Sequence, residues 1–212
     1  YLLTSSNNTL TSNTGTSNSS YAVYLYDSNN NKLYNQTAIN YLTGTNSYGI
    51  AFRNANNTII QDCINISGRN GDVLYIASPS TNNTFINCSY RITGTNETVL
   101  ARGNLIRKWY YRANVTDNSS NPVANANILA WNVSGGLEIN QTTAGNGFTS
   151  ITTITEYVNT GGTRVYYSNY TINASKTGYE TVTNASYNVT TYTNNLNHKF
   201  KFSTTNVSQT DT

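Results

Sequence analysis

The stretch Asn56-Asn57-Thr58-Ile59-Ile60-Gln61-Asp62-Cys63 returns with small changes as Asn82-Asn83-Thr84-Phe85-Ile86-Asn87-Cys88. Both copies place a short apolar segment directly after a pair of asparagines. Similar pairs open Asn7-Asn8-Thr9-Leu10 and Asn30-Asn31-Lys32-Leu33, so the four pairs lie 23, 26 and 26 residues apart. A unit of about 25 residues made of short strands and polar turns predicts a parallel β-solenoid, whose coils bury their apolar side chains only by stacking.

The segments around the asparagine pairs have the periodicity of strands. Alternating apolar stretches precede the pairs, as at residues 21–26 and 48–52, and a glycine turn such as Ile66-Ser67-Gly68 closes a unit. Asparagines at equivalent turns are expected to hydrogen bond from coil to coil. Over residues 1–105 the pattern resembles the right-handed β-helix repeats of pectate-lyase-like and carbohydrate-binding proteins. It is especially similar to the Asn-Asn-Thr-Ile-Ile coils of archaeal surface proteins.

The two cysteines, Cys63 and Cys88, follow corresponding asparagine pairs in adjacent units. Equivalent backbones in stacked coils lie about 4.8 Å apart, which is within the Cα separation of a disulfide. The register is off by one, because Cys63 is six residues after Asn57 and Cys88 is five after Asn83. A disulfide would therefore need a bulge or a slipped turn. The alternative is two buried free thiols.

The second half of the chain has a different period. Longer alternating stretches begin near residue 107, as at residues 108–115 and 163–167, and glycine or asparagine turns separate them. Strands at this spacing predict an antiparallel β-sandwich. The expected fold class is therefore all-β, a short right-handed parallel β-helix followed by an antiparallel sandwich. The expected domains are residues 1–105 and 106–202, with a Ser/Thr-rich tail or linker at 203–212.

Sequence motifs in this half resemble those of carboxypeptidase regulatory-like domains. They are Val115-Thr116-Asp117, Pro122-Val123-Ala124-Asn125-Ala126-Asn127-Ile128, Thr143-Ala144-Gly145, Tyr170-Thr171-Ile172-Asn173-Ala174 and Gly178-Tyr179. The resemblance implies a small prealbumin-like sandwich that serves as a spacer, attachment module or assembly unit without catalysis. Asn125 stands where this family often has glycine, which leaves the conformation of that turn open.

Acceptor triplets for N-linked glycans, Asn-X-Ser/Thr with X other than Pro, occur along the whole chain. The asparagines of these 17 triplets are Asn7, Asn18, Asn35, Asn56, Asn65, Asn82, Asn87, Asn96, Asn114, Asn118, Asn132, Asn140, Asn169, Asn173, Asn184, Asn188 and Asn206. Their density predicts an extracellular protein, either secreted or at the cell surface. In the first half the repeat itself accounts for some triplets, while in the second half chance and selection for glycans are the alternatives.

Charge and hydropathy exclude several partners. Only 10% of the residues are charged and the net charge is +3. The sequence has no cluster of Lys and Arg that could bind along the phosphate backbone of a nucleic acid. We therefore expect no nucleic acid partner. No apolar run is long enough to span a bilayer within this chain. The small number of carboxylates predicts tolerance to acid.

Catalytic and metal-binding patterns are not recognised in the sequence. The acids of the first half are Asp27, Asp62, Asp72 and Glu97, which fall at different phases of the repeat and are not expected to converge. His198 is the single histidine and lies in a polar run. We expect no catalytic residue, no metal site and no cofactor other than covalent glycans. The 18 tyrosines suit half-buried strands, and a sugar-binding face is the alternative.

These observations predict a non-enzymatic, N-glycosylated structural protein in a surface filament, appendage or surface layer. Its expected partners are copies of itself or neighbouring surface proteins. Residues 1–20 are polar and lack a capping helix, and we expect them to pair with a neighbouring subunit as an added strand. The alternatives are a carbohydrate-binding adhesin and a β-helix enzyme that cleaves polysaccharides.

Overall fold

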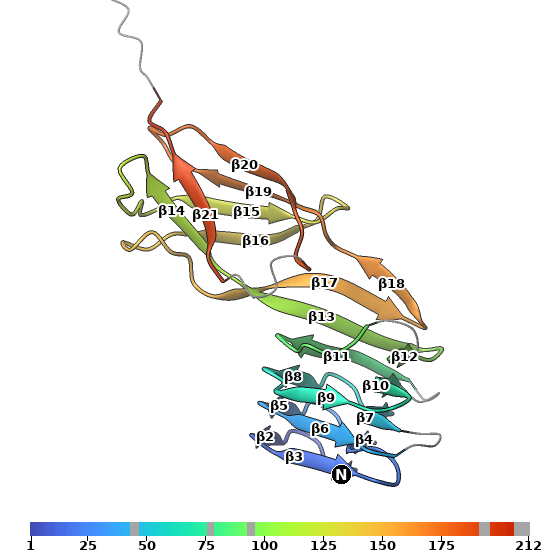
Figure 1. The fold of residues 1–212 in the computed structure, drawn as a ribbon. Helices are drawn as coiled ribbons and strands as arrows, with labels where there is room; N and C mark the ends of the chain where they lie inside the picture. The colour runs from blue at the N-terminus through green and yellow to red at the C-terminus, as the bar shows by residue number, and fades with distance from the viewer. Residues whose placement is uncertain (43–46, 76–78, 93–95, 191–195, 206–212) are drawn as a thin grey trace, which may run out of the picture. The chain divides into compact units, whose positions relative to one another are not determined.

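The computed structural model describes residues 1–42, 47–75, 79–92, 96–190 and 196–205 (Figure 1). These residues form strands and turns, with no α-helix among them. The chain divides into two compact units. Unit 1 contains Tyr1–Lys108 and Tyr157–Val165, and unit 2 contains Trp109–Glu156 and Tyr166–Thr212. Residues 157–165 thus belong with the first unit, although they lie within the sequence range expected for the second domain.

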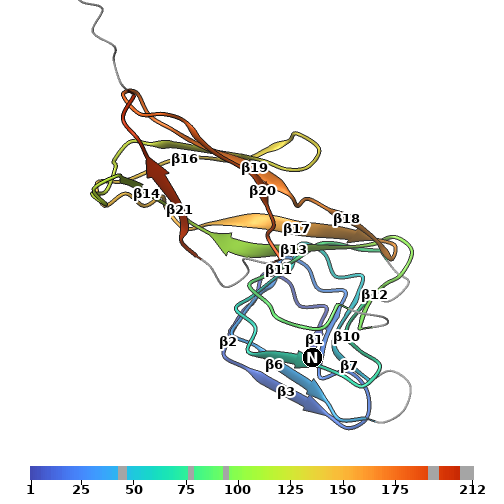
Figure 2. The ribbon, with the colours of Figure 1, turned by 45° about the horizontal axis from the view of Figure 1, so that its top comes forward.

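Unit 1 is a β-solenoid, as the repeat predicted, and Figure 2 looks partly along its stacked coils. Each of the first three coils contributes one strand to each of three sheets. The first sheet has the order β1 (Leu2–Leu3), β4 (Val23–Tyr26), β7 (Tyr48–Arg53), β10 (Gly71–Tyr75), β12 (Glu97–Val99). The second has the order β18 (Thr163–Tyr166), β17 (Thr152–Thr160), β13 (Gly103–Tyr111), β11 (Ser80–Ile86), β8 (Ile59–Gln61), β5 (Lys32–Tyr34), β2 (Thr9–Thr11). The third has the order β3 (Thr14–Ser17), β6 (Thr37–Asn40), β9 (Asn65–Ser67).

Single residues with left-handed backbone turn the chain from one sheet to the next. Most of them are Asn or Asp, the non-glycine residues that adopt this conformation most readily. The residues stack in columns at three corners of the coil, and their φ angles lie between 48° and 63°. The columns are Thr4, Asp27, Asn54; then Asn7, Asn30, Asn57, Asn82; and then Ser12, Asn35, Asp62, Asn87. The asparagines of the repeat therefore serve first as corner residues.

A second set of asparagines points into the coil, where their side-chain amides hydrogen bond to backbone groups of the preceding coil. Asn83 is fully buried, accepts a hydrogen bond from the Thr58 N–H at 3.0 Å and donates to the Ala55 carbonyl at 2.7 Å. Asn31, at the equivalent position of an earlier coil, binds the Asn8 N–H and the Ser5 carbonyl in the same way. These bonds confirm that asparagines link equivalent turns along the stack.

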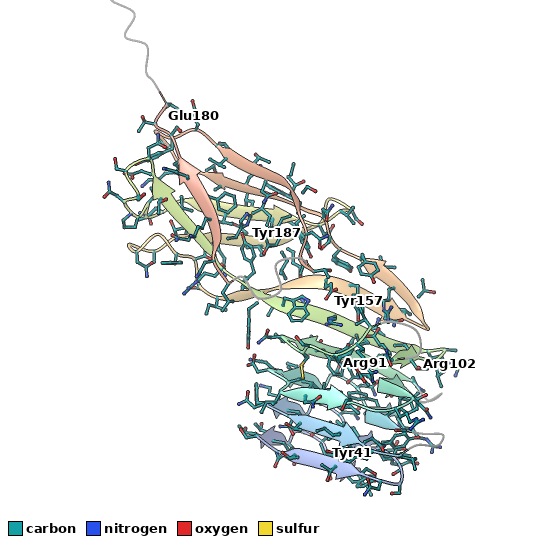
Figure 3. All side chains as sticks on the ribbon, viewed as in Figure 1. Tyr41, Arg91, Arg102, Tyr157, Glu180 and Tyr187 are labelled. Carbon is teal, nitrogen blue, oxygen red and sulfur yellow. A yellow bond between two sulfur atoms is a disulfide. The ribbon has the colours of Figure 1, made fainter. Side chains whose placement is uncertain are left out.

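The strand register corrects the alignment taken from the asparagine pairs. Ile59 lies beside Thr84 and Ile60 beside Phe85, so Asn82 stacks on Asn57 rather than on Asn56. The distance between these coils is therefore 25 residues, not 26. Cys63 and Cys88 are also 25 residues apart and form a disulfide with a Cα separation of 4.7 Å, drawn as the yellow bond in Figure 3. The disulfide is confirmed, and it needs no slipped turn.

Residues 1–20 form the first coil of the same chain and do not stand free as an added strand. Strands β1, β2 and β3 pair in parallel with β4, β5 and β6. The apolar core of unit 1 lies between the three sheets and contains Leu25, Leu33, Phe52, Ile60 and Phe85, among other side chains. Stacking these residues coil upon coil buries them completely.

Unit 2 contains an antiparallel sheet and a separate parallel pair. The antiparallel sheet has the order β16 (Leu137–Thr142), β15 (Asn127–Trp131), β19 (Tyr170–Ser175), β20 (Val182–Tyr187). The pair consists of β14 (Ala113–Asp117) and β21 (His198–Phe202), which run parallel, unlike the wholly antiparallel arrangement expected for this half. Side chains from both, such as Val115, Ile128, Ile172 and Phe200, share one core.

The motif residues of unit 2 stabilise its turns. Thr143 is buried, donates its hydroxyl hydrogen to the Val123 carbonyl at 2.6 Å and accepts from the Ala126 N–H at 2.9 Å. Asn125 has φ 56°, so it takes the left-handed conformation for which glycine was the expected residue. Gly147 has φ 78°, and a Cβ there would lie 2.5 Å from the Val115 carbonyl oxygen. The turn left open by the sequence is thus a left-handed asparagine turn.

Replacement of Asn83 by Ala should lower the free energy of unfolding by about 2 to 4 kcal/mol, because it leaves a buried N–H and a buried carbonyl without partners. The acceptor triplet at Asn82 is kept. Asn8→Ala is the matched control at the same repeat position in the first coil, and its cost should stay below about 1 kcal/mol. Urea denaturation of the two variants measures the difference, and equal costs would show that the inward asparagines do not hold the coils.

Candidate functional site

The acids at the coil corners are bonded to the neighbouring coil. Asn54 donates from Nδ2 to Asp27 Oδ1 at 2.6 Å, and Asn87 donates from Nδ2 to Asp62 Oδ1 at 2.7 Å. Asp27 and Asp62 belong to different corner columns, which are separated by β5 or its equivalent strand. Each carboxylate therefore links its own corner column to the next coil, and the two columns are separate.

Asp72 and Glu97 face opposite sides of the first sheet. Val73 pairs with Glu97, and both are buried on the inner side, so Asp72 points to the other side because successive strand residues alternate. Asp72 is itself buried and pairs with Arg91, whose Nη2 lies 2.9 Å from Asp72 Oδ1. Hydrogen bonding to Asp72 raises the pKa of Arg91 further. Two convergent carboxylates, which acid-base cleavage of a glycosidic bond requires, are thus not formed by this pair.

Glu97 forms a buried polar network at the last coil. Its carboxylate accepts hydrogen bonds from Tyr90 Oη at 2.7 Å, Tyr157 Oη at 2.5 Å, Asn159 Nδ2 at 2.7 Å and Arg164 Nε at 3.1 Å. Burial and the adjacent carboxylate raise the pKa of Tyr90 well above its ordinary value, so the phenol stays a proton donor. The Glu97 carboxylate is thus fully hydrogen-bonded, and the network joins the last coil to residues from β17 and β18.

Three members of this network come from residues 157–165, which we call the lid segment. The lid segment comprises the end of β17, the Gly161–Gly162 turn and most of β18, and Tyr157 is labelled in Figure 3. A hydrogen bond from the Gly161 N–H to the Gly103 carbonyl joins it to β13. Glu97 was expected only to stand apart from the other acids, and this network was not predicted. No local signal marks it, because the residues on either side, Asn96 and Thr98, are polar and most partners of Glu97 come from elsewhere in the chain.

Two acids of unit 2, Glu138 and Glu156, are also engaged in structural bonds. Glu138 accepts from the Thr155 N–H at 3.0 Å and from the hydroxyl groups of Thr155 and Tyr170. Glu156 accepts from Trp109 Nε1 at 2.5 Å and from the Thr190 hydroxyl at 3.0 Å. Within the described ranges, no three His, Cys, Asp or Glu side chains gather as a metal site would require.

His198 lies among aromatic side chains on β21 rather than in a polar run. Its ring stacks on Tyr187, which Figure 3 labels, with centroids 4.5 Å apart. Its Nδ1 and Nε2 atoms lie 3.1 Å from Tyr111 Oη and 3.1 Å from Asn184 Nδ2, respectively. The Asn184 amide can donate only to an unprotonated Nε2, so this arrangement suits the neutral ring. Burial lowers the pKa of His198 to about 4.

The asparagines of the acceptor triplets and the buried asparagines are different residues. Eight triplet asparagines are exposed: Asn7, Asn18, Asn35, Asn65, Asn82, Asn118, Asn140 and Asn169. Every other triplet asparagine that the structure describes is half-buried, and Asn206 lies outside the described residues. The fully or almost fully buried asparagines of the described chain, Asn31, Asn40, Asn83 and Asn159, all lie outside the triplets.

Five tyrosines cluster on the outer side of the first sheet near the first two coils. We call Tyr1, Tyr21, Tyr24, Tyr26 and Tyr48 the tyrosine face. Tyr24 and Tyr26 flank buried Leu25 on β4 and therefore point outward.

Ring contacts connect the members of the tyrosine face. The centroid distances are 5.9 Å from Tyr1 to Tyr24, 4.9 Å from Tyr21 to Tyr24 and 6.4 Å from Tyr21 to Tyr48. The Arg53 guanidinium lies 5.1 Å from the centre of the Tyr26 ring. Partial burial, followed by the neighbouring tyrosines, raises the pKa of Tyr21 and keeps its hydroxyl neutral. The face thus offers aromatic surface together with neutral hydroxyl groups and one cation.

No known family model matches this sequence, and no curated protein matches it significantly. None of the described residues forms a helix with the length and hydrophobicity needed to cross a membrane.

His198 should make the protein less stable as the pH falls from about 6.5 to about 4, because the unfolded chain takes up the proton before the folded chain does. The loss should reach at most about 3 kcal/mol and should be complete below the folded pKa. Urea denaturation of the wild type and of His198→Gln, each across this range, isolates the effect. Equal pH dependence of the two proteins would contradict this role of His198. The acid tolerance expected from the small number of carboxylates should appear in the variant, which lacks the histidine.

Proposed function

We propose that this chain is an exported, N-glycosylated structural protein, serving as a subunit or segment of a surface layer, filament or adhesive appendage. The proposal includes an archaeal cell surface and a carboxypeptidase regulatory-like second unit, on the sequence motifs described above. It assigns the chain no catalytic activity.

The placement of the asparagines is the observation that carries this proposal. Buried asparagines avoid the acceptor triplets, and the described triplet asparagines avoid the core. A glycan needs an asparagine that reaches solvent, so the sorting is what selection for glycans on a folded exterior would produce. Chance in an Asn-rich chain would place triplets on inward asparagines as readily as on outward ones.

The disulfide and the carboxylates support the same proposal. Cys63–Cys88 favours an oxidising compartment, where such bonds form and persist. Asp27, Asp62, Asp72 and Glu97 each hold a structural hydrogen bond, which supports a role in building the solenoid rather than in cleaving a polysaccharide.

Peptide mapping by mass spectrometry of the protein from its native source should find glycans at the eight exposed triplet asparagines. Asn56 is the internal control, because its Nδ2 donates to Asn29 Oδ1 at 3.0 Å and its Oδ1 accepts from the Thr81 N–H at 2.7 Å. A glycan on Asn56 would disturb these bonds, so its occupancy should be the lowest in the first half. Unmodified asparagines at the exposed positions would overturn the proposal.

Carbohydrate binding is the second candidate function, and the tyrosine face favours it. Aromatic rings with a polar fringe can contact the apolar side of a sugar while bonding to its hydroxyl groups. Binding of the intact, deglycosylated protein to a glycan array should then fall at least about tenfold in Tyr24→Ala, a loss of roughly 1.4 kcal/mol. Tyr166→Ala, an exposed tyrosine of unit 2 that is not part of the tyrosine face, is the control. Arrays that show no binding by the wild type would exclude this candidate.

A further inference from the structure

The antiparallel sheet of unit 2, formed by β16, β15, β19 and β20 in Figure 1, has an apolar strip on its outer face. Ile128 and Ala130 of β15 are fully buried in the core of unit 2. Leu129 and Trp131 alternate with them and therefore point to the other side of the sheet. Both are half-buried, and neither is part of that core. Leu137 lies opposite Trp131 on β16 and is 51% exposed. We call Leu129, Trp131 and Leu137 the outer strip.

Two acceptor asparagines flank the outer strip on the neighbouring strands. Asn140 on β16 and Asn173 on β19 both lie directly opposite Leu129. Side chains in such register share one face of the sheet, and their Cβ atoms lie about 5 Å apart. Asn173 is also the diagonal neighbour of Trp131. Leu129 thus lies between two acceptor asparagines that are about 10 Å apart, since neighbouring strands are about 4.8 Å apart.

The side-chain amides of these two asparagines are free to carry a glycan. Within the described part of the chain, neither Asn140 nor Asn173 makes a side-chain hydrogen bond. Asn184, a triplet asparagine of β20 in the same sheet, differs from them. Its Nδ2 lies 3.1 Å from His198 Nε2, so the atom that would bear a glycan is already engaged.

Apolar surface beside two acceptor asparagines favours the glycans themselves as its cover. A sugar ring packs its apolar side on aromatic and aliphatic side chains while its hydroxyl groups form hydrogen bonds. Partners for these hydroxyl groups lie in the adjacent row of the face, which consists of Asn127, Thr142 and Ser175. A pocket of about 630 Å³ opens there, and Asn127 and Ser175 are among the residues that line it. A protein partner would have to pass two glycans that start on either side of Leu129.

We propose that the first sugars of glycans on Asn140 and Asn173 pack on Leu129 and Trp131 and form the cover of this face. The inference rests on the proposed function, because it requires an N-glycosylated chain. It gives two particular glycans a structural role, including one on the half-buried Asn173. Without them the outer strip would face water, so their removal should expose Trp131 and weaken the folded state.

Acrylamide quenching of tryptophan fluorescence tests the cover directly. The chain has two tryptophans, and Trp109 is only 3% exposed, so the quencher reports mainly on Trp131. The double variant Asn140→Gln, Asn173→Gln is compared with the wild type, both produced in the native source. Its quenching constant should be at least about twofold higher, because the indole of Trp131 regains contact with solvent. Asn118→Gln removes an exposed triplet elsewhere in unit 2 and should leave the quenching constant unchanged.

A second pair of changes keeps both asparagines in place. Thr142→Ala together with Ser175→Ala abolishes the same two acceptor triplets and should raise quenching as the glutamine pair does. Thr142→Ser together with Ser175→Thr retains the triplets and should quench as the wild type does. The comparison separates the loss of the glycans from the loss of the asparagine side chains.

Urea denaturation shows whether the sugars act through the outer strip. Loss of both triplets should lower the equilibrium constant of folding at least about tenfold. In a Trp131→Thr background the same loss should be less than about threefold, because the sugars have already lost their aromatic partner. Circular dichroism of each variant establishes that it is folded.

Peptide mapping by mass spectrometry separates this inference from the proposed function. A wild type with glycans at other exposed triplets, but with Asn140 or Asn173 unmodified, would overturn the inference and leave the proposed function standing. A chain without any glycan would end both. With both sites occupied, unchanged quenching in the glycan-free variants would show that the sugars extend into solvent and that the inference is wrong. Equal losses of stability with and without Trp131 would also contradict packing on the outer strip.

Discussion

The backbone N–H and C=O groups of the coils in unit 1 find their hydrogen-bond partners in neighbouring coils. Strands of all three sheets pair in parallel between successive coils, and inward asparagines such as Asn31 and Asn83 bind the backbone at bends where the strands stop. Because of this dependence, the coils at the ends of a solenoid need hydrogen-bond partners and apolar contacts from outside the stack. After the last coil, the lid segment and Glu97 supply these contacts.

Much of unit 1 follows from the sequence because its repeat is read directly from asparagine and apolar positions. The spacing predicted the solenoid and placed Cys63 and Cys88 in neighbouring coils, where they form the expected disulfide. The register was wrong because consecutive asparagines look alike in the sequence, while one turns a corner and the other points inward. Asn82 and Asn57 share the left-handed conformation, and this conformation, rather than the identity of the residue, sets the alignment.

The lid segment could not be found from sequence pattern alone. Residues 157–165 alternate as any half-buried strand does, and nothing local connects Tyr157 or Arg164 to Glu97, which lies about 60 residues earlier. The aromatic surroundings of His198 could not be predicted for a similar reason, because Tyr111 and Tyr187 come from distant strands. Local motifs did indicate the turns of unit 2, where Asn125 takes a left-handed conformation, although the partners of Thr143 lie 17 and 20 residues earlier in the chain. The parallel pairing of β14 with β21 joins segments more than 80 residues apart, which no local motif encodes.

Asparagine thus has three uses in this chain: at corners, inside the coil and on the exterior as acceptor triplets. Asn7, Asn35, Asn82 and Asn87 are both corner residues and triplet asparagines. The exterior triplets are the basis for the proposed role at a cell surface. The inward and exterior uses exclude each other, since an amide that binds two backbone groups in the core has no access to a glycan. A protein with few charges can in this way present a strongly polar exterior.

The central claim is that the lid segment completes the last coil of the solenoid. Amide hydrogen exchange tests this claim most directly, because local opening is easiest where neighbouring contacts are missing. Protection in β11 and β13, next to the lid segment, should be as high as in β8 in the middle of the stack. Rapid exchange in β11 and β13 would contradict this account.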